Sequence, residues 1–275
     1  VTRITKPLND RGQYNVILVD WAMLAGLPWY VTAVGNTKII GPHVARLVRW
    51  LDAQRAVPLS NLHVIGFSLG AEIAGFMGKA LGRICFQVGR ITGLDPAYPL
   101  YMNSGREGHL TAADALFVDV IHTDGGHFGF PNPLGHVDFY PNGGRAIQPG
   151  FVCGHNRAWM FYAESVVNPF GFPASRCPRW RADIRANCMW TPDVLMGFAV
   201  QSTVRGKFYL RTNAEPPFHL TLPWSQHCHR NPLSFSRVLR AEVREVGQYC
   251  HRIPLGISRN LHTEVGKASQ RFNVG

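Results

Sequence analysis

The chain has 275 residues, 46% of them hydrophobic, and a formal net charge of +11. This length can bury one substantial core with room for a small second unit, and the sequence has no run of eighteen apolar residues, which argues against a membrane-spanning helix. The positive charge is compatible with nucleic acid, anionic lipid or acidic polysaccharide as a partner. Because the sequence has no dense Lys/Arg run, we prefer to interpret the charge as scattered and solvated.

Six cysteines occur, and none of them forms a C-x-x-C pair. This spacing disfavours structural zinc and favours disulfides in an oxidising compartment, although six cysteines allow fifteen pairings. The first residues, VTRITKPLND, lack the apolar core of a signal peptide and do not start with Met. We therefore expect a mature form, a fragment or an incomplete gene model, which says little about the compartment.

Apolar runs and helical spacings alternate along the first half of the chain. Strands are predicted at YNVILVDW (14–21), NLHVIGF (61–67), GRITGLDPA (89–97) and ALFVDVIHTD (115–124). Helices are predicted at TKIIGPHVARLVRWLDAQ (37–54) and LGAEIAGFMGKAL (69–81). This alternation indicates an α/β fold with a largely parallel sheet, whose functional groups gather at the carboxyl ends of the strands.

The pattern changes after about Val166. The following residues are rich in Pro and Arg and are typical of loops, with one more candidate strand at GKFYLRT (206–212). The last fifty or so residues have weak periodicity.

The stretch Gly66-Phe67-Ser68-Leu69-Gly70 reads G-x-S-x-G between a predicted strand and a predicted helix. In that context the motif predicts a sharp turn that presents Ser68 as a nucleophile. The flanking glycines are expected to leave room for close packing of strand and helix. The backbone N–H of Leu69, at the start of the helix, is the expected donor to an oxyanion.

A nucleophilic serine needs a base, and the base needs an orienting carboxylate. Asp95 ends a predicted strand directly before Pro96, which makes it the candidate for the orienting acid. The alternative is that Asp95 is only a turn residue of an Asp-Pro pair. Spacing leaves the base open among the histidines that follow: His109, His122, His127, His136 and His155.

Several stretches together resemble the catalytic domain of the pancreatic lipase family. They are HVIGFSLGAEIAG, GRITGLDPAYPLY, DALFVDVIHTDGG, GHVDFYPNGG, QPGFVCGHNRAWMFYAESV and VNPFGFPA. The resemblance covers about Tyr14 to Pro217 and implies an α/β-hydrolase fold, with a largely parallel central sheet and helices on both faces. It also implies that Ser68 is the nucleophile, Asp95 the orienting acid and His155 the general base, with His122 as scaffold.

The resemblance also predicts how the chain is divided. Residues 1–218 are expected to form the catalytic domain without its first strands, and residues 219–275 a basic, poorly ordered tail. Relatives usually carry His at the position of Phe67, so we expect altered packing under the turn. In relatives the second oxyanion donor follows a strand ending in His-Gly, a segment that we expect to precede Val1.

Two surface loops of the family are short in this chain. Only Phe151 and Val152 separate QPG from Cys153, where triacylglycerol lipases carry a disulfide-closed lid, and the loop Gly126–Leu134 is also short. Short forms of both loops resemble phospholipases A1, so we favour a secreted phospholipase A1-like hydrolase. A triacylglycerol lipase and an inactive lipid-binding, yolk-type relative are the alternatives. The expected partner is a lipid or phospholipid at an interface, with peripheral membrane contact and no nucleic acid.

The resemblance gives two further expectations. Of the family's calcium site only Asp114 remains, so no metal or other cofactor is predicted and Asp114 is expected to cap a helix or turn. Cys177 and Cys188 have the spacing of a family disulfide and are predicted to pair. Cys228–Cys250 is a guess.

Overall fold

The computed structural model describes residues 2–26, 28–82, 86–145, 153–177 and 194–220. They belong to a compact unit, Val1–Leu222, and a second unit, Pro223–Gly275, lies outside the described residues. The helices are α1 (Thr2–Asp10), α2 (Tyr30–Ala53), α3 (Leu69–Leu81) and α4 (Cys153–Val167). The strands are β1 (His63–Phe67), β2 (Arg90–Leu94), β3 (Phe117–Ile121), β4 (Val137–Pro141), β5 (Pro173–Ala174), β6 (Val194–Leu195) and β7 (Gly206–Leu210).

The main sheet has five strands in the order β1-β2-β3-β4-β7, and every neighbouring pair is parallel. Parallel strands end at the same edge of a sheet, so the carboxyl ends of β1, β2 and β3 lie side by side. Every residue of β3 and β4 is buried. This burial explains why four of the five residues of β3 are apolar, rather than every second one.

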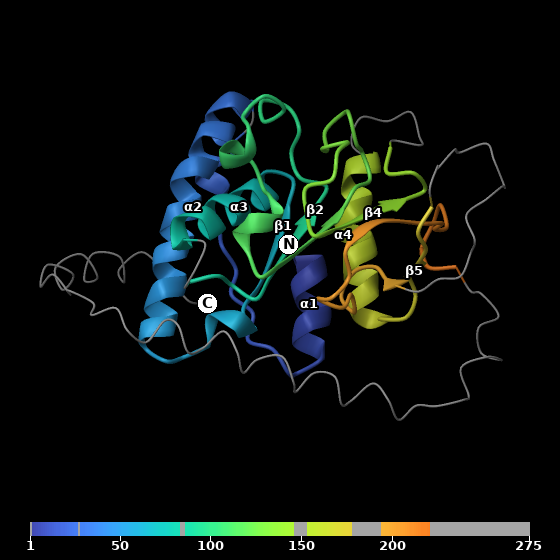
Figure 1. Ribbon diagram of the computed structural model, residues 1–275, viewed down its shortest axis with the longest axis horizontal. Helices are drawn as coiled ribbons and strands as arrows, with labels where there is room; N and C mark the ends of the chain where they lie inside the picture. The colour runs from blue at the N-terminus through green and yellow to red at the C-terminus, as the bar shows by residue number, and fades with distance from the viewer. Residues whose placement is uncertain (1, 27, 83–85, 146–152, 178–193, 221–275) are drawn as a thin grey trace, which may run out of the picture. The chain divides into compact units, whose positions relative to one another are not determined.

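Helices cover both faces of this sheet (Figure 1). On one face, α2 and α3 pack over Ile91, Val118 and Val120. On the other face, α1 and α4 pack together, with Leu8 of α1 in the same core as Phe139 of β4. The predicted α/β architecture, with helices on both faces, is confirmed. None of the helices that the structure describes combines the length and the apolar character needed to cross a membrane.

The strand predicted at 14–21 is wrong. The segment forms no regular structure, and Ile17 and Leu18 are 57% and 59% exposed. Its sequence has the apolar, β-branched character of a buried strand, but among the described residues it has no ladder partner, and β1 is the outermost strand of the sheet. A segment with strand propensity forms a strand only where a neighbouring strand can pair with its backbone N–H and C=O groups.

The other predicted elements were found, with strand boundaries that differ by up to three residues and a start of α2 that differs by seven. The helix predicted at 37–54 begins earlier, at Tyr30, and continues through Pro42. Gly41 lets α2 approach α3 closely, because a Cβ at this position would meet Phe76. The candidate strand at 206–212 is β7, which pairs with β4. The tail predicted at 219–275 lies outside the described residues from 221 onward.

The two glycines of G-x-S-x-G have different roles. A Cβ at Gly66, in β1, would meet the carbonyl of Gly70 and the backbone nitrogen of Ala71, whereas a Cβ at Gly70 would meet nothing. The expectation of close strand–helix packing therefore holds for Gly66 and is wrong for Gly70. Gly66 allows the first turn of α3 to fold back against the end of β1.

A buried polar cluster fixes α3 on its other side. The Nζ atom of Lys79 donates to Asp114 Oδ2 at 2.5 Å and to the carbonyl of His109 at 2.7 Å. Asp114 also accepts from the backbone N–H of Thr111, which confirms its predicted capping role. Glu72 of α3 is fully buried and accepts from the backbone N–H of Leu110 at 2.7 Å. Burial is the main cause that raises the pKa of Glu72 to about 8.

We expect Gly66→Ala to lower the free energy of unfolding by about 1–3 kcal/mol, because overpacking displaces backbone that cannot move aside. Gly70→Ala is the matched control and should be neutral or stabilising by up to about 1 kcal/mol, since alanine favours a helix. Urea unfolding of the two variants measures both effects. Equal stabilities would contradict the close approach at Gly66.

The raised pKa of Glu72 predicts a pH-dependent stability. Between the unfolded value of 4.5 and the folded value of about 8, the folded state binds more protons, so stability falls as pH rises through this window. Glu72→Gln should flatten this decline, measured as unfolding free energy at about pH 5 and about pH 9. The control is Glu215→Gln, which removes an exposed carboxylate. An unchanged decline in Glu72→Gln would contradict the assignment.

Candidate active site

Ser68 lies in the turn between β1 and α3 with backbone angles φ 54° and ψ −121°. A non-glycine residue in this region is strained, and such strain persists only where the surrounding structure holds it. Here the Ser68 N–H donates to Leu94 O at 3.0 Å, and the Ala97 N–H donates to Ser68 O at 3.3 Å. Leu69 is the first residue of α3, so its N–H has no partner within the helix. The turn therefore presents a serine hydroxyl next to an available backbone donor.

Asp95 directly follows β2 and is fully buried. Its Oδ1 atom accepts from the backbone N–H groups of Thr123 at 2.8 Å and of Asp124 at 3.1 Å. These donors follow β3, the next strand in the sheet. A Cβ at Gly129 would collide with the same carboxylate, so a glycine there leaves room for it. The parallel sheet thus supplies both the acid and the groups that hold it.

His155 lies in the first turn of α4 and is 9% exposed. Its Nδ1 atom is 2.6 Å from Asp95 Oδ2. Because a carboxylate accepts hydrogen bonds, this contact assigns the proton to Nδ1 and leaves Nε2 as the basic atom. Thr123 also donates its hydroxyl to the carbonyl of His155 at 3.4 Å. Loop and helix together fix the direction of the imidazole.

Two phenylalanines flank the imidazole of His155. The ring centroid of Phe67 is 4.6 Å from that of His155, and the ring centroid of Phe128 is 5.6 Å away. Phe67 directly precedes Ser68 and so connects the serine turn to the histidine. The sequence predicted altered packing under the turn at Phe67, but did not reveal its contact with His155 or the part of Phe128. Both depend on tertiary contacts between distant segments.

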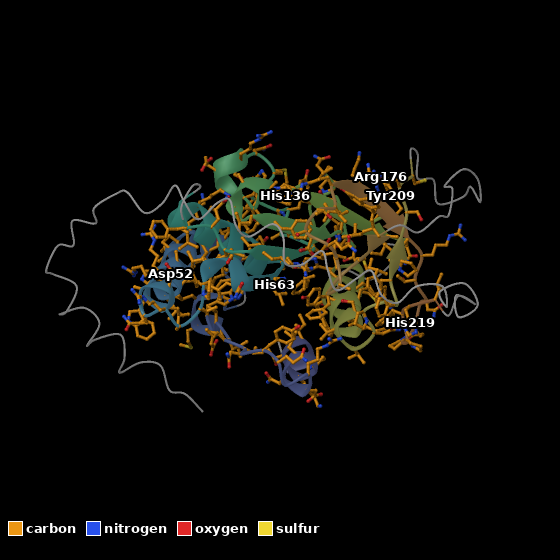
Figure 2. The ribbon with its side chains drawn as sticks, turned by 60° about the horizontal axis from the view of Figure 1, so that its bottom comes forward. Asp52, His63, His136, Arg176, Tyr209 and His219 are labelled. Carbon is orange, nitrogen blue, oxygen red and sulfur yellow. The ribbon has the colours of Figure 1, made fainter. Side chains whose placement is uncertain are left out.

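The other candidate bases are engaged elsewhere. His122 is buried, with Nε2 at 2.8 Å from Asp138 Oδ1 and Nδ1 at 2.7 Å from Phe130 O, as expected for scaffold. His127 contacts Asp124 at 3.1 Å, and its side chain is 47% exposed. His109 contacts the carbonyl of Leu110. The Nδ1 atom of His136, labelled in Figure 2, accepts from the backbone N–H of Val118. The histidine that the structure places against Asp95 is His155.

Asp95, Asp124 and His155 place three metal-ligand atoms within 4.8 Å of one another. Their hydrogen bonds are those expected of an acid–base pair, Asp95 and His155, rather than of a metal site. Both oxygens of Asp95 already accept N–H groups, and Asp124 Oδ2 accepts from the backbone N–H of Phe128 at 3.2 Å. A cation would have to displace these donors. At the position predicted from the family's calcium site, the cation that Asp114 contacts is the ammonium of Lys79.

Three predictions involve residues outside the described ranges. Cys188 lies outside, so the pairing of Cys177 with Cys188 stays a prediction, and so does that of Cys228 with Cys250, which both lie outside. Residues 146–152, the position of the short lid, are likewise outside, so that expectation rests on the sequence.

The chain was compared with known proteins. A family model described as Lipase matches residues 1–218. The chain is 36% identical over 234 residues to a putative endothelial lipase of Crotalus adamanteus, covering 74% of this chain and 46% of the relative. It is 35% identical over 237 residues to human hepatic triacylglycerol lipase, covering 74% and 47%. It is 40% identical over 199 residues to lipase member H-B of Xenopus laevis, covering 67% and 42%.

The matched region thus spans less than half the length of these curated relatives. The family match nevertheless includes every strand of the main sheet and all three residues of the candidate site. The parallel sheet with helices on both faces agrees with the α/β-hydrolase fold. The chain belongs to the Lipase family.

Proposed function

We propose that the protein hydrolyses carboxylic esters of lipids through an acyl-enzyme formed on Ser68. The observation that carries this proposal is the 2.6 Å contact between Asp95 and His155, made beside the strained turn that holds Ser68. The residues follow the chain order Ser, Asp, His of α/β-hydrolases. An inactive lipid-binding role is less well supported, because the histidine and the acid are held in a geometry that suits proton transfer.

In this mechanism the hydroxyl of Ser68 attacks the ester carbonyl while Nε2 of His155 takes its proton. Asp95 stabilises the resulting imidazolium through Nδ1, and the Leu69 N–H donates to the oxyanion. His155 then gives the proton to the departing alcohol. Water, activated by the same nitrogen, attacks the acyl-enzyme and releases the fatty acid.

Removal of a triad member should abolish most of the activity. Ser68→Ala and His155→Ala should each lower kcat/KM for a soluble short-chain ester by about three orders of magnitude or more. His127→Ala is the matched control, because His127 is a nearby histidine whose side chain is 47% exposed and contacts Asp124. Initial rates on the full-length protein measure the effect. If His127→Ala lost activity and His155→Ala kept it, the base would be misassigned.

For the substrate class we propose a phospholipase A1-like preference. The described loop Gly126–Leu134 is short and folds back on the site: Tyr98 N–H donates to Phe128 O, and Phe130 N–H donates to Pro96 O. The lid position in the sequence is also short. A site without large apolar walls suits a lipid with a polar head group. Triacylglycerol hydrolysis remains the second candidate, since one relative is named hepatic triacylglycerol lipase.

We also propose that the protein acts outside the cell at a lipid surface. Six cysteines without a C-x-x-C pair support an oxidising compartment. The excess of Lys and Arg supports attraction to anionic lipid surfaces, with peripheral rather than spanning contact.

The substrate preference can be tested by direct comparison. We expect the full-length protein to release fatty acid faster from phosphatidylcholine than from a long-chain triacylglycerol presented in the same mixed micelles. Ser68→Ala provides the background rate for both. Faster release from the triacylglycerol would reverse the assignment of substrate class, while leaving the triad untouched.

A further inference from the structure

A cavity of about 240 Å³ opens beside the helix that carries His155. Its wall combines the start of α4, the end of β4 and the segment that follows β7. Ligand pockets usually measure about 300–1,000 Å³, so this cavity suits a small group rather than an acyl chain with its glycerol. Ser68, Asp95 and His155 are not among its described lining residues, but Gly154, the residue before His155, is.

Two arginines give the cavity its charge. Arg145 and Arg157 both line it, and none of its described lining residues is Asp or Glu. Within the part of the chain that the structure describes, neither guanidinium forms an ion pair. The guanidinium of Arg157 lies 4.9 Å from the centre of the Phe218 ring, a contact that orients the side chain without neutralising it. Among the described residues, the cavity therefore carries two positive charges and no acidic partner for them.

The wall opposite α4 is held by a reciprocal pair of hydrogen bonds. The Nδ2 atom of Asn142 donates to Thr212 Oγ1 at 2.8 Å, and the backbone N–H of Thr212 donates to Asn142 Oδ1 at 3.0 Å. This pair joins the residues that directly follow β4 to those just after β7. The binding surface is therefore formed before any ligand arrives, which reduces the ordering cost of binding.

Thr123 connects the cavity to the catalytic groups. It lines the cavity, its backbone N–H donates to Asp95, and its hydroxyl donates to the carbonyl of His155. Gly154, directly before His155, lines the cavity as well. The cavity and the Asp95–His155 pair therefore share Thr123 as a common contact.

We propose that this cavity binds the phosphate of a phospholipid head group while an ester of the same molecule lies at Ser68. A guanidinium matches phosphate oxygens with paired N–H donors, and the phosphate of a glycerophospholipid is only a few bonds from its ester carbonyls. The inference rests on the proposed hydrolysis of lipid esters. It adds the residues, Arg145 and Arg157, that distinguish a phospholipid from a neutral glyceride.

The test compares two substrates with the same acyl chains, dihexanoylphosphatidylcholine and dihexanoylglycerol, both kept monomeric so that adsorption to an interface plays no part. In the double variant Arg145→Gln, Arg157→Gln, we expect kcat/KM for the phospholipid to fall by about tenfold to hundredfold. The value for dihexanoylglycerol should stay within about twofold. Arg145→Gln alone, at an exposed position, should show a smaller loss with the same selectivity.

The matched control is Arg46→Gln, Arg106→Gln, which removes the same charge from two exposed arginines outside the cavity and should change neither value. Equal losses on both substrates, or none on the phospholipid, would overturn the inference. The inference would also be overturned if wild type bound inorganic phosphate tightly while the double variant kept the wild-type ratio of kcat/KM between the two substrates. The cavity would then be a site for free phosphate. A wild type inactive on both substrates would instead overturn the proposed function, and this inference with it.

Discussion

The candidate site depends on one buried carboxylate. Asp95 is fully excluded from water, and each of its oxygens is held by an N–H group from another segment. A buried charge is costly unless it is paired and hydrogen-bonded, so Thr123, Asp124 and His155 compensate for a penalty that the fold would otherwise carry. The same contacts orient the imidazole. The contacts that stabilise the buried carboxylate are thus the same contacts that orient the base.

The sheet explains how these groups meet. Ser68, Asp95 and Thr123 each lie at or just beyond the carboxyl end of β1, β2 or β3, which are neighbours in one parallel sheet. α4 approaches from the face opposite to α3 and brings His155 to the same edge. The strain at Ser68 is held by backbone hydrogen bonds to the Asp95 side of the sheet. Strand order therefore brings together site residues that lie far apart in the chain.

Sequence reasoning predicted the parts of this arrangement that are local. The strand, turn and helix around Ser68 follow from apolar runs and G-x-S-x-G, and Asp95 from its place at a strand end. Spacing could not choose His155, because its partner lies sixty residues away in the chain. The strand predicted at 14–21 was wrong for a related reason: pairing is a tertiary property that composition does not report. The contacts of Phe67 with His155 and of Arg157 with Phe218 could not be predicted from the sequence for the same reason.

The central claim is that Ser68 is a nucleophile activated by His155. Reaction of the full-length protein with a fluorophosphonate, followed by peptide mass spectrometry, tests it most directly. The account predicts a single phosphonyl adduct on the peptide containing Ser68, formed much more slowly in His155→Ala and absent from Ser68→Ala. Labelling of Ser68→Ala at the wild-type rate, or an adduct on another residue, would contradict it.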